Sequence, residues 1–224
     1  MPFRFELFRI SNLKIDQQGY RHVTHRTKGS IPRRRIWDKV LPATKVMPKV
    51  LLPIVDKPLI QYAIEEAICA GIDTLSFVTG RNKRAIEDYF DANLELEVAL
   101  RGKGKHDQAD MVHNILPSGV ECIFLRQAEQ LGLGHAILCV ERVVGNEPFA
   151  LLIADDFLTY RGKGITSDLI EKPNFENTPS NLASIGRYVL TPDICDIIRN
   201  YSIGAGGEIQ HADSINVQAE NNRV

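Results

Sequence analysis

The feature that most constrains this sequence is an uninterrupted apolar run, Pro-Phe-Ala-Leu-Leu-Ile-Ala, over residues 148–154. A short run without polar alternation is typical of a β-strand that is covered on both faces by other layers. Two acidic residues, Asp155 and Asp156, follow it directly. The run therefore predicts a central strand in a layered α/β structure, with carboxylates at its carboxyl end.

The residues before this run alternate between helical and extended patterns. The predicted helices cover 58–71, 82–90, 134–140 and a Glu/Lys-rich stretch that reaches about residue 115 with breaks at Gly102 and Gly104; the predicted strands cover 74–79, 120–125 and 149–154. This alternation predicts a three-layer α/β unit over 41–156 with a mainly parallel sheet. In such a sheet, the ligand crevice lies at the carboxyl ends of the strands.

Composition agrees with one globular domain, which we place at residues 40–224. The chain has 224 residues, of which 44% are hydrophobic and 25% are charged. No stretch approaches the roughly 18 consecutive apolar residues of a membrane span, and the start lacks the pattern of a secretory signal. We expect a cytoplasmic protein that does not contact a membrane.

Residues 1–39 differ from the remainder in charge. They carry ten Lys/Arg against three acidic residues, a net charge of +7, so the remaining residues carry −8. Residues 3–8 alternate well enough for a short strand, and Arg33-Arg34-Arg35 could touch an anionic surface. Because no aromatic platform or DNA-binding motif accompanies the charge, we predict a solvated, poorly ordered basic leader and no nucleic-acid partner.

The four cysteines give no sign of a metal or redox site. Cys69, Cys122, Cys139 and Cys195 are far apart, without a CxxC pair or a histidine at zinc-ligand spacing. Their apolar surroundings predict buried thiols.

The first segment suited to chemistry is proline-rich and covers residues 41–62. Its prolines fix an extended path that presents Lys45 and Lys49. A rigidly held ammonium can neutralise phosphate charge that develops in a transition state. In isolation, such lysines are also what an ordinary surface loop contains.

Three further segments accompany it. Arg126-Gln127 follows a predicted strand and precedes the turn Gly132-Leu133-Gly134-His135, which alone is no more than a turn before a helix. Asp155 follows the apolar run, where a carboxylate suits Mg²⁺, although an acidic loop or helix cap would look the same. The last segment, residues 170–210, contains Glu171-Lys172-Pro173, Gly186-Arg187-Tyr188 and Gly207-Glu208-Ile209.

In this order and at these spacings, the four segments resemble the bacterial UTP–glucose-1-phosphate uridylyltransferases over about residues 40–220. The resemblance implies an incomplete Rossmann-like nucleotidyltransferase fold and an enzyme that forms UDP-glucose and pyrophosphate from UTP and glucose 1-phosphate. It also implies a role for each matching residue: Lys49 and Lys172 as catalytic groups at the phosphates, Lys45, Gln127, Gly132 and Gly134 at the nucleotide, Glu171, Gly186 and Glu208 at the sugar, and Asp155 as the ligand of Mg²⁺. Relatives commonly assemble as dimers or tetramers, so a homo-oligomer is expected.

The sequence departs from the family pattern at several places. The family's Gly-x-Gly-Thr-Arg loop is replaced by Arg-Ile-Trp-Asp-Lys-Val over residues 35–40, which lacks a glycine to approach phosphate, and Val50 replaces an expected glutamate. Only fourteen residues separate Asp156 from Glu171, and the family's later segment with a second aspartate is missing. We therefore expect a partial domain with very low activity.

Two alternatives remain open at this stage. One is a non-catalytic remnant that binds sugar nucleotide or an intact paralogue. The other is a related enzyme that transfers a thymidylyl or adenylyl group to a hexose phosphate; the Arg-Gln and Gly-Leu-Gly-His context favours uridylyl transfer.

Overall fold

The structure is a computed structural model that describes residues 5–9, 26–31, 42–81, 83–129, 131–154, 165–171, 186–200 and 211–220. Its strands are β1 (Phe5–Arg9), β2 (Arg26–Ile31), β3 (Pro53–Ile54), β4 (Lys57–Pro58), β5 (Thr74–Thr79), β6 (Glu121–Arg126), β7 (Phe149–Leu152), β8 (Ile165–Glu171) and β9 (Arg187–Leu190). Its α-helices are α1 (Leu59–Cys69), α2 (Arg84–Phe90), α3 (Leu94–Gly102), α4 (His106–His113), α5 (Leu133–Val144), α6 (Ile194–Asn200) and α7 (His211–Glu220), with short 3₁₀ helices η3 (Ala43–Lys45) and η4 (Lys49–Leu51).

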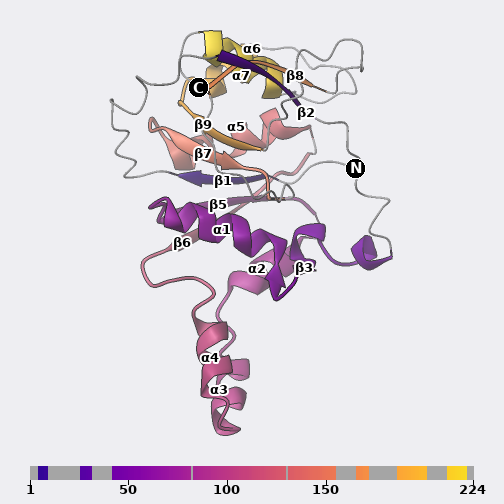
Figure 1. The fold of residues 1–224 in the computed structure, drawn as a ribbon, viewed down its shortest axis with the longest axis vertical. Helices are drawn as coiled ribbons and strands as arrows, with labels where there is room; N and C mark the ends of the chain where they lie inside the picture. Colours follow the sequence, from indigo (N-terminus) through magenta and orange to yellow (C-terminus); the bar gives the residue numbers. More distant parts are fainter. Residues whose placement is uncertain are drawn as a thin grey trace.

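A five-stranded sheet with the order β6-β5-β1-β7-β9 forms the centre of the molecule. β5 and β6 pair in parallel, and β1 is antiparallel to both of its neighbours, β5 and β7. The three strands predicted from the sequence therefore run in the same direction, as expected. A separate two-stranded parallel sheet, β2–β8, lies at the same end of the molecule as α6 and α7 (Figure 1).

Two hydrophobic clusters cover the two faces of the sheet. Leu75 and Phe77 of β5 contact α1 and α2, whereas Val78 packs with the helices on the opposite face. The same alternation divides β7, where Leu152 belongs to the first cluster and Leu151 to the second. Because neighbouring residues of a strand point to opposite faces, a continuous apolar run is what such a strand requires. The predicted three-layer α/β architecture is confirmed.

Helix ends follow the local sequence signals. Pro58, at the N-cap of α1, has an extended backbone, and Gly71 just beyond that helix has φ +87°. The break predicted at Gly102 and Gly104 separates α3 from α4, and Gly104 has φ +72°. Both positive values lie in the left-handed region that glycine adopts without steric cost.

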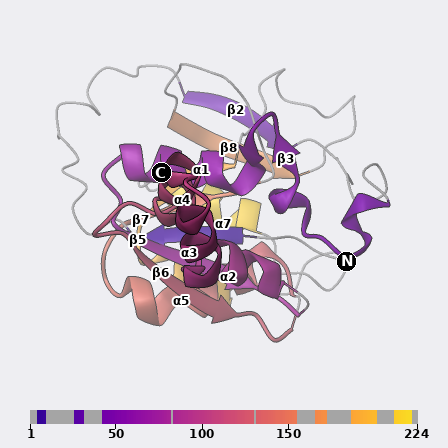
Figure 2. The ribbon, with the colours of Figure 1, turned by 90° about the horizontal axis from the view of Figure 1, so that it is seen from below.

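Helices α3 and α4 form a hairpin that projects from the body of the molecule (Figure 1). Figure 2, seen from below, views this hairpin end on, in front of the sheet. It lies opposite the end that carries α6 and α7.

Two sequence expectations need correction. Residues 5–9 are not part of a poorly ordered leader, because they form β1, the middle strand of the sheet. The pairing is also less parallel than expected, since β1 separates β7 from β5 and β9 pairs antiparallel with β7. The local alternation of residues 3–8 was enough to predict a strand, but its partners lie more than 60 residues away and leave no local signal.

We expect Phe77→Ala to be strongly destabilising. The Phe77 side chain is fully buried. Its ring centroid lies 5.1 Å from that of Phe90 and 5.0 Å from that of Phe124. Removing it leaves a cavity, so the free energy of unfolding should fall by about 3–5 kcal/mol in urea titrations. Val189→Ala, at a side chain that is 40% exposed, is the control and should change it by about 0.5 kcal/mol or less. A small effect of Phe77→Ala would contradict this account of the core.

Candidate functional site

The strands β5, β6 and β7 end along the same edge of the central sheet. The Gln127 N–H, just after β6, donates a hydrogen bond of 2.9 Å to the carbonyl of Thr79 at the end of β5. The Ile153 N–H, just after β7, donates one of 2.8 Å to the carbonyl of Gly186 at the start of β9. Since β5, β6 and β7 run in one direction, these residues lie at the carboxyl edge, where α/β sheets bind ligands.

Gln127 is tied to the turn that begins α5. Its side chain is buried, and its Nε2 donates a hydrogen bond of 3.1 Å to the carbonyl of Gly132. Nδ1 of His135 lies 3.1 Å from Gln127 Nε2 and 3.0 Å from the carbonyl oxygen of Glu129. The Gln127 amide nitrogen is therefore committed within the protein, while no described residue donates to its Oε1 atom. This arrangement fixes which atom of the amide is available to a ligand.

The turn itself depends on glycine. Gly132, the N-cap of α5, has φ +93° and ψ −175°, a conformation that residues with a Cβ rarely adopt. Gly134 lies in the first turn of α5, and both glycines are buried. The chain thus passes close under the edge of the sheet before the helix begins.

The proline-rich segment lies on the face of the sheet that α1 covers. Val50 is fully buried in the cluster that also contains Leu152 and Ala154, and η4 contacts α1. Lys49, the residue before Val50, is half-buried, whereas Lys45 in η3 is exposed. Lys49 is therefore held closer to the core than Lys45.

A polar network holds the β3–β4 turn against α1. The Tyr62 hydroxyl oxygen lies 2.8 Å from the carbonyl oxygen of Ile54 and 3.0 Å from Oδ1 of Asp56. Lys57 forms an ion pair with Glu65, and the hydrogen bond to that carboxylate raises the pKa of Lys57. Burial and then the hydrogen bond to Asp56 raise the pKa of Tyr62. At neutral pH both groups keep the protons that this network uses.

Arg187 was not predicted as a functional residue, yet it joins two elements at the edge. Its Nε donates a hydrogen bond of 2.9 Å to Oε2 of Glu66 in α1, and its Nη1 donates one of 2.9 Å to the carbonyl of Ile153. The signal that could have found it is its position, directly after Gly186 in the fourth motif. The guanidinium fixes the chain where it leaves β7.

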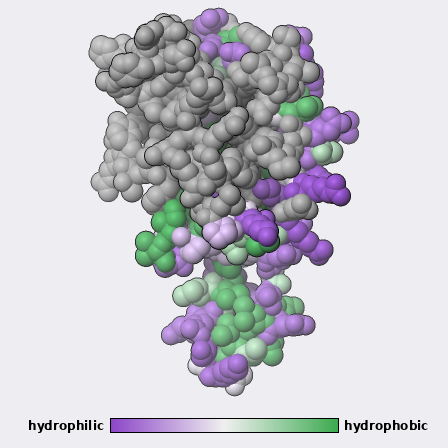
Figure 3. All heavy atoms as spheres, turned by 90° about the vertical axis from the view of Figure 1, so that its right-hand side faces the viewer, coloured by the Kyte–Doolittle hydropathy of each residue, from purple (hydrophilic) through white to green (hydrophobic). Residues whose placement is uncertain are grey.

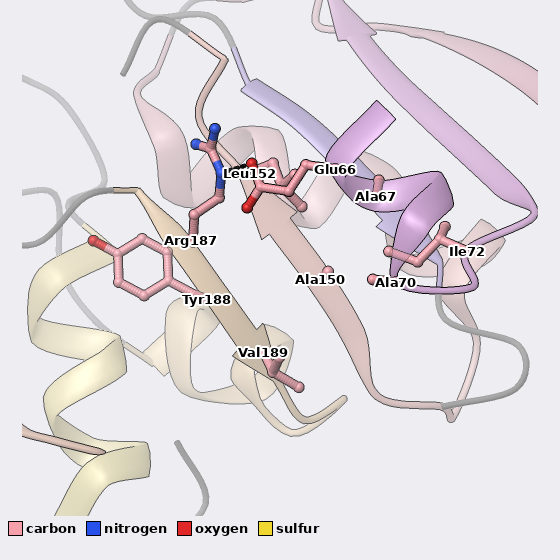
Figure 4. A pocket seen from close by; sticks show the side chains of 9 residues that line it. All are labelled: Glu66, Ala67, Ala70, Ile72, Ala150, Leu152, Arg187, Tyr188 and Val189. Atoms are coloured by element: carbon pink, nitrogen blue, oxygen red, sulfur yellow. Dashed lines mark hydrogen bonds and ion pairs between the residues drawn. The ribbon is translucent and has the colours of Figure 1, made fainter. Parts of the chain in front are cut away.

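A pocket of about 200 Å³ lies beside this arginine (Figure 4). Its floor is β7, and its two sides are α1 and β9. It is lined by Glu66, Ala67, Ala70, Ile72, Ala150, Leu152, Arg187, Tyr188 and Val189. Apart from the ion pair at one end, this lining is apolar, so the pocket lacks the polar groups that a sugar or phosphate requires.

Several predicted site residues lie outside the described part of the chain. These are the metal ligand Asp155, the catalytic Lys172 and the sugar-binding Glu208. Glu171 ends β8 in register with Ile31, and Gly186 lies at the carboxyl edge. The roles assigned to all of these residues remain predictions.

No group of three or more His, Cys, Asp or Glu side chains suited to a metal occurs among the described residues. Mg²⁺ needs few protein oxygens and completes its shell with phosphate and water, so a single carboxylate after Ala154 is compatible with it.

The cysteines differ in exposure. Cys195 is buried and Cys122 and Cys139 are half-buried, whereas Cys69 at the end of α1 is exposed, which corrects the prediction of four buried thiols. Burial raises the pKa of Cys122 to about 12 and that of Cys195 to about 11. These two thiols therefore stay protonated and unreactive at neutral pH.

Comparison with known proteins agrees with this architecture. A family model described as nucleotidyl transferase matches residues 38–162, more than half of the chain. The solved structure of an apo UDP-glucose pyrophosphorylase is 37% identical, with a TM-score of 0.73 over 89% of each chain. A UTP-bound UGPase from Acinetobacter baumannii is 30% identical, with a TM-score of 0.72 over 89% of this chain and 85% of its own. The fold and its carboxyl-edge site define a nucleotidyltransferase.

Two relatives identify the family within the nucleotidyltransferases. UTP–glucose-1-phosphate uridylyltransferase 1 of Staphylococcus saprophyticus is 40% identical and covers 84% of this chain and 80% of its own length. The UTP–glucose-1-phosphate uridylyltransferase of Pseudomonas aeruginosa is also 40% identical, over 83% of this chain and 82% of its own length. The chain belongs to the UTP–glucose-1-phosphate uridylyltransferase family.

The same comparison indicates a loss of residues relative to the S. saprophyticus enzyme. The 84% of this chain that aligns with the S. saprophyticus enzyme is about 188 residues, but the alignment has 232 positions. About 44 positions of the aligned region therefore have no counterpart in this chain.

Among the described residues, no helix combines the length and the apolar character that crossing a membrane would take.

We expect Gly132→Ala to destabilise the protein and to disturb the turn below Gln127. Its φ of +93° with an extended ψ is a backbone conformation that costs alanine about 1–3 kcal/mol. Thermal unfolding should show this loss. The control is Gly102→Ala at the end of α3, where the backbone φ is ordinary and a Cβ meets nothing within 4 Å. That change should leave stability equal or slightly higher; equal behaviour of both variants would contradict the argument.

Proposed function

We propose that this protein binds UTP and glucose 1-phosphate and transfers the uridylyl group, forming UDP-glucose and pyrophosphate. The observation that carries the proposal is the carboxyl edge, along which the fixed Gln127 and its glycine turn follow β6 and Gly186 precedes β9. The proposal is supported by relatives that are named UTP–glucose-1-phosphate uridylyltransferases. One solved structure, 37% identical to this chain, is a UDP-glucose pyrophosphorylase complexed with UDP-glucose.

Recognition of uracil is assigned to Gln127. Its Nε2 is held by the Gly132 carbonyl, which leaves Oε1 as the atom that faces a ligand. Uracil carries an N–H donor at N3, which Oε1 can accept, whereas cytosine has an acceptor at that position. Gly132 and Gly134 allow the base to approach the backbone of the turn. The proposal therefore includes a preference for uridine over cytidine nucleotides.

The phosphates are assigned to lysines. Lys49 is anchored on the α1 side of the sheet by its buried neighbour Val50, while Lys45 is exposed, where it can attract the triphosphate. Lys172 is proposed to contact the phosphates of both substrates. Asp155 would hold Mg²⁺, which would neutralise phosphate charge when bound.

The sugar is assigned to Glu171, Gly186 and Glu208. Within this set, Glu171 ends β8, and the carbonyl of Gly186 accepts the Ile153 N–H at the carboxyl edge. The Arg187–Glu66 ion pair next to it keeps this edge in place. A carboxylate such as that of Glu171 is suited to accept hydrogen bonds from glucose hydroxyls.

The rate should be far below that of relatives with the glycine-rich loop. Little covalent chemistry is needed in this reaction, so positioning and charge stabilisation determine the rate. Loss of a preorganised donor costs about 10² to 10³ in rate, and residues 35–40 contain no glycine to form the family's phosphate loop. A coupled pyrophosphate-release assay with UTP, glucose 1-phosphate and Mg²⁺ measures it, with the P. aeruginosa enzyme as reference.

Titration calorimetry with UDP-glucose completes this test. Slow turnover with binding supports the proposal. Binding without turnover would show a non-catalytic sugar-nucleotide protein, and neither binding nor turnover would overturn the proposal. Turnover equal to that of the reference enzyme would contradict the role given to the missing loop.

We expect Gln127→Met to remove the preference for uridine. The change keeps the side-chain length but removes the acceptor, so the affinity for UDP should fall by about tenfold or more, while that for CDP should not. Glu121→Gln, at the opposite end of β6, is the matched control and should leave both affinities unchanged. A parallel loss for both nucleotides would mean that Gln127 only maintains the turn.

A further inference from the structure

Arg187 makes three polar contacts at the point where the pairing of β7 with β9 ends. Its Nε donates a hydrogen bond of 2.9 Å to Oε2 of Glu66 in α1. Its Nη1 donates to the carbonyl oxygens of Ile153 and Gly186, at 2.9 Å and 3.3 Å. The side chain is only 21% exposed, and Figure 4 shows it against Glu66 at one end of the apolar pocket. One guanidinium therefore joins a helix to two neighbouring strands.

These contacts close the last rung of the β7–β9 ladder. The ladder pairs Leu152 with Arg187, and the Ile153 N–H continues it by donating to the carbonyl of Gly186. That carbonyl thus accepts one hydrogen bond from the backbone and one from Arg187 Nη1. The end of a ladder is where local opening starts most easily. The guanidinium holds the two chains together at this position.

The backbone that Arg187 holds lies next to groups assigned to the substrates. Gly186 is itself assigned to the sugar, and Ile153 precedes the proposed metal ligand Asp155 by two residues. Gly186 has φ +66°, so the chain turns immediately before it enters β9. Because these hydrogen bonds of Arg187 go to protein acceptors, its effect on a substrate would pass through Gly186 and Ile153.

The shape of the guanidinium explains why this position requires arginine. Its nitrogens lie in one fixed plane, so Nε can bond to a carboxylate while Nη1 bonds to carbonyl oxygens. The contact with Glu66 fixes the direction of that plane. A lysine would keep the charge, but its single nitrogen cannot span the carboxylate and both carbonyls with the same geometry.

We propose that Arg187 is a positioning residue for the sugar, which acts by clamping Ile153 to Gly186 and is itself oriented by Glu66. This role rests on the proposed function. Loss of the clamp should loosen the sugar end of the site and leave base recognition at Gln127 intact, since β5, β1 and β7 lie between β6 and β9. A residue needed only for stability would instead weaken both ends together.

Titration calorimetry of the full chain with UDP-glucose and with UDP tests this role. The native chain should bind UDP-glucose more tightly than UDP, because glucose adds contacts at the Gly186 end. Arg187→Lys should raise the Kd for UDP-glucose by about tenfold and leave the Kd for UDP unchanged. Arg199→Lys is the matched control, because Arg199 also joins two elements through a glutamate, Glu141 of α5. It should leave both affinities unchanged.

Hydrogen exchange gives a readout that needs no ligand. In Arg187→Lys the Ile153 amide should exchange about tenfold faster, because its hydrogen bond lies at the loosened rung. The Gln127 amide, bonded to the carbonyl of Thr79, should keep its native rate. The α3–α4 hairpin should also keep its rates, because it projects away from the sheet (Figure 3).

A second variant tests whether Glu66 acts through the arginine. Glu66→Ala should speed exchange at Ile153 and weaken UDP-glucose binding, each by less than Arg187→Lys does. Combined with Arg187→Lys, it should add little, because residues that act as one unit are not additive. Independent, additive effects would contradict the orienting role of Glu66.

The possible results separate this role from the proposed function. If the native chain prefers UDP-glucose to UDP and Arg187→Lys keeps that preference, the positioning role is wrong while the proposed function stands. Equal weakening of both ligands, an unchanged exchange rate at Ile153, or a native chain that binds both ligands equally would also overturn the role. If the native chain binds neither ligand, the proposed function fails and this role fails with it.

Discussion

The arrangement of the whole domain depends on the backbone pairing of β1 with both β5 and β7. Without β1, the five-stranded sheet would separate into two pairs, β5–β6 and β7–β9, each with an unpaired edge. Unpaired N–H and C=O groups at such buried edges are costly, so the central position has to be filled by a strand. The antiparallel direction of β1 satisfies these groups as a parallel strand would, and it leaves β5, β6 and β7 running the same way.

The geometry of the candidate site follows from that shared direction. Gln127 after β6 and Ala154 after β7 reach the same edge because their strands are co-directional, and β9 returns its first residues to that edge because it is antiparallel. Two side-chain anchors then fix the loops. Gln127 Nε2 ties the glycine turn to the end of β6, and Arg187 ties β9 to α1 through Glu66.

The sequence predicted those parts of the fold whose signals are local. The strands β5, β6 and β7 and the helices from α1 to α5 follow from apolar periodicity and from glycine or proline at their ends. The motif also singled out Gln127 and Gly132, which the structure joins by a hydrogen bond. The sequence did not predict the central place of β1, its antiparallel pairing or the Arg187–Glu66 contact. Each of these depends on partners 65 or more residues apart in the chain. Exposed Cys69 was missed because helix-end exposure depends on packing.

Under the proposed function, the departures from the family pattern fall in the segments assigned to phosphate and sugar more than in the turn assigned to the base. The turn from Gln127 to His135 rests on its own hydrogen bonds and on the pairing of β6 with β5, neither of which involves residues 35–40 or the shortened connection after Asp156. Binding of uracil should therefore survive changes that remove transition-state stabilisation, since the two use different atoms. A family member that loses its phosphate loop would then retain nucleotide selectivity while its rate falls.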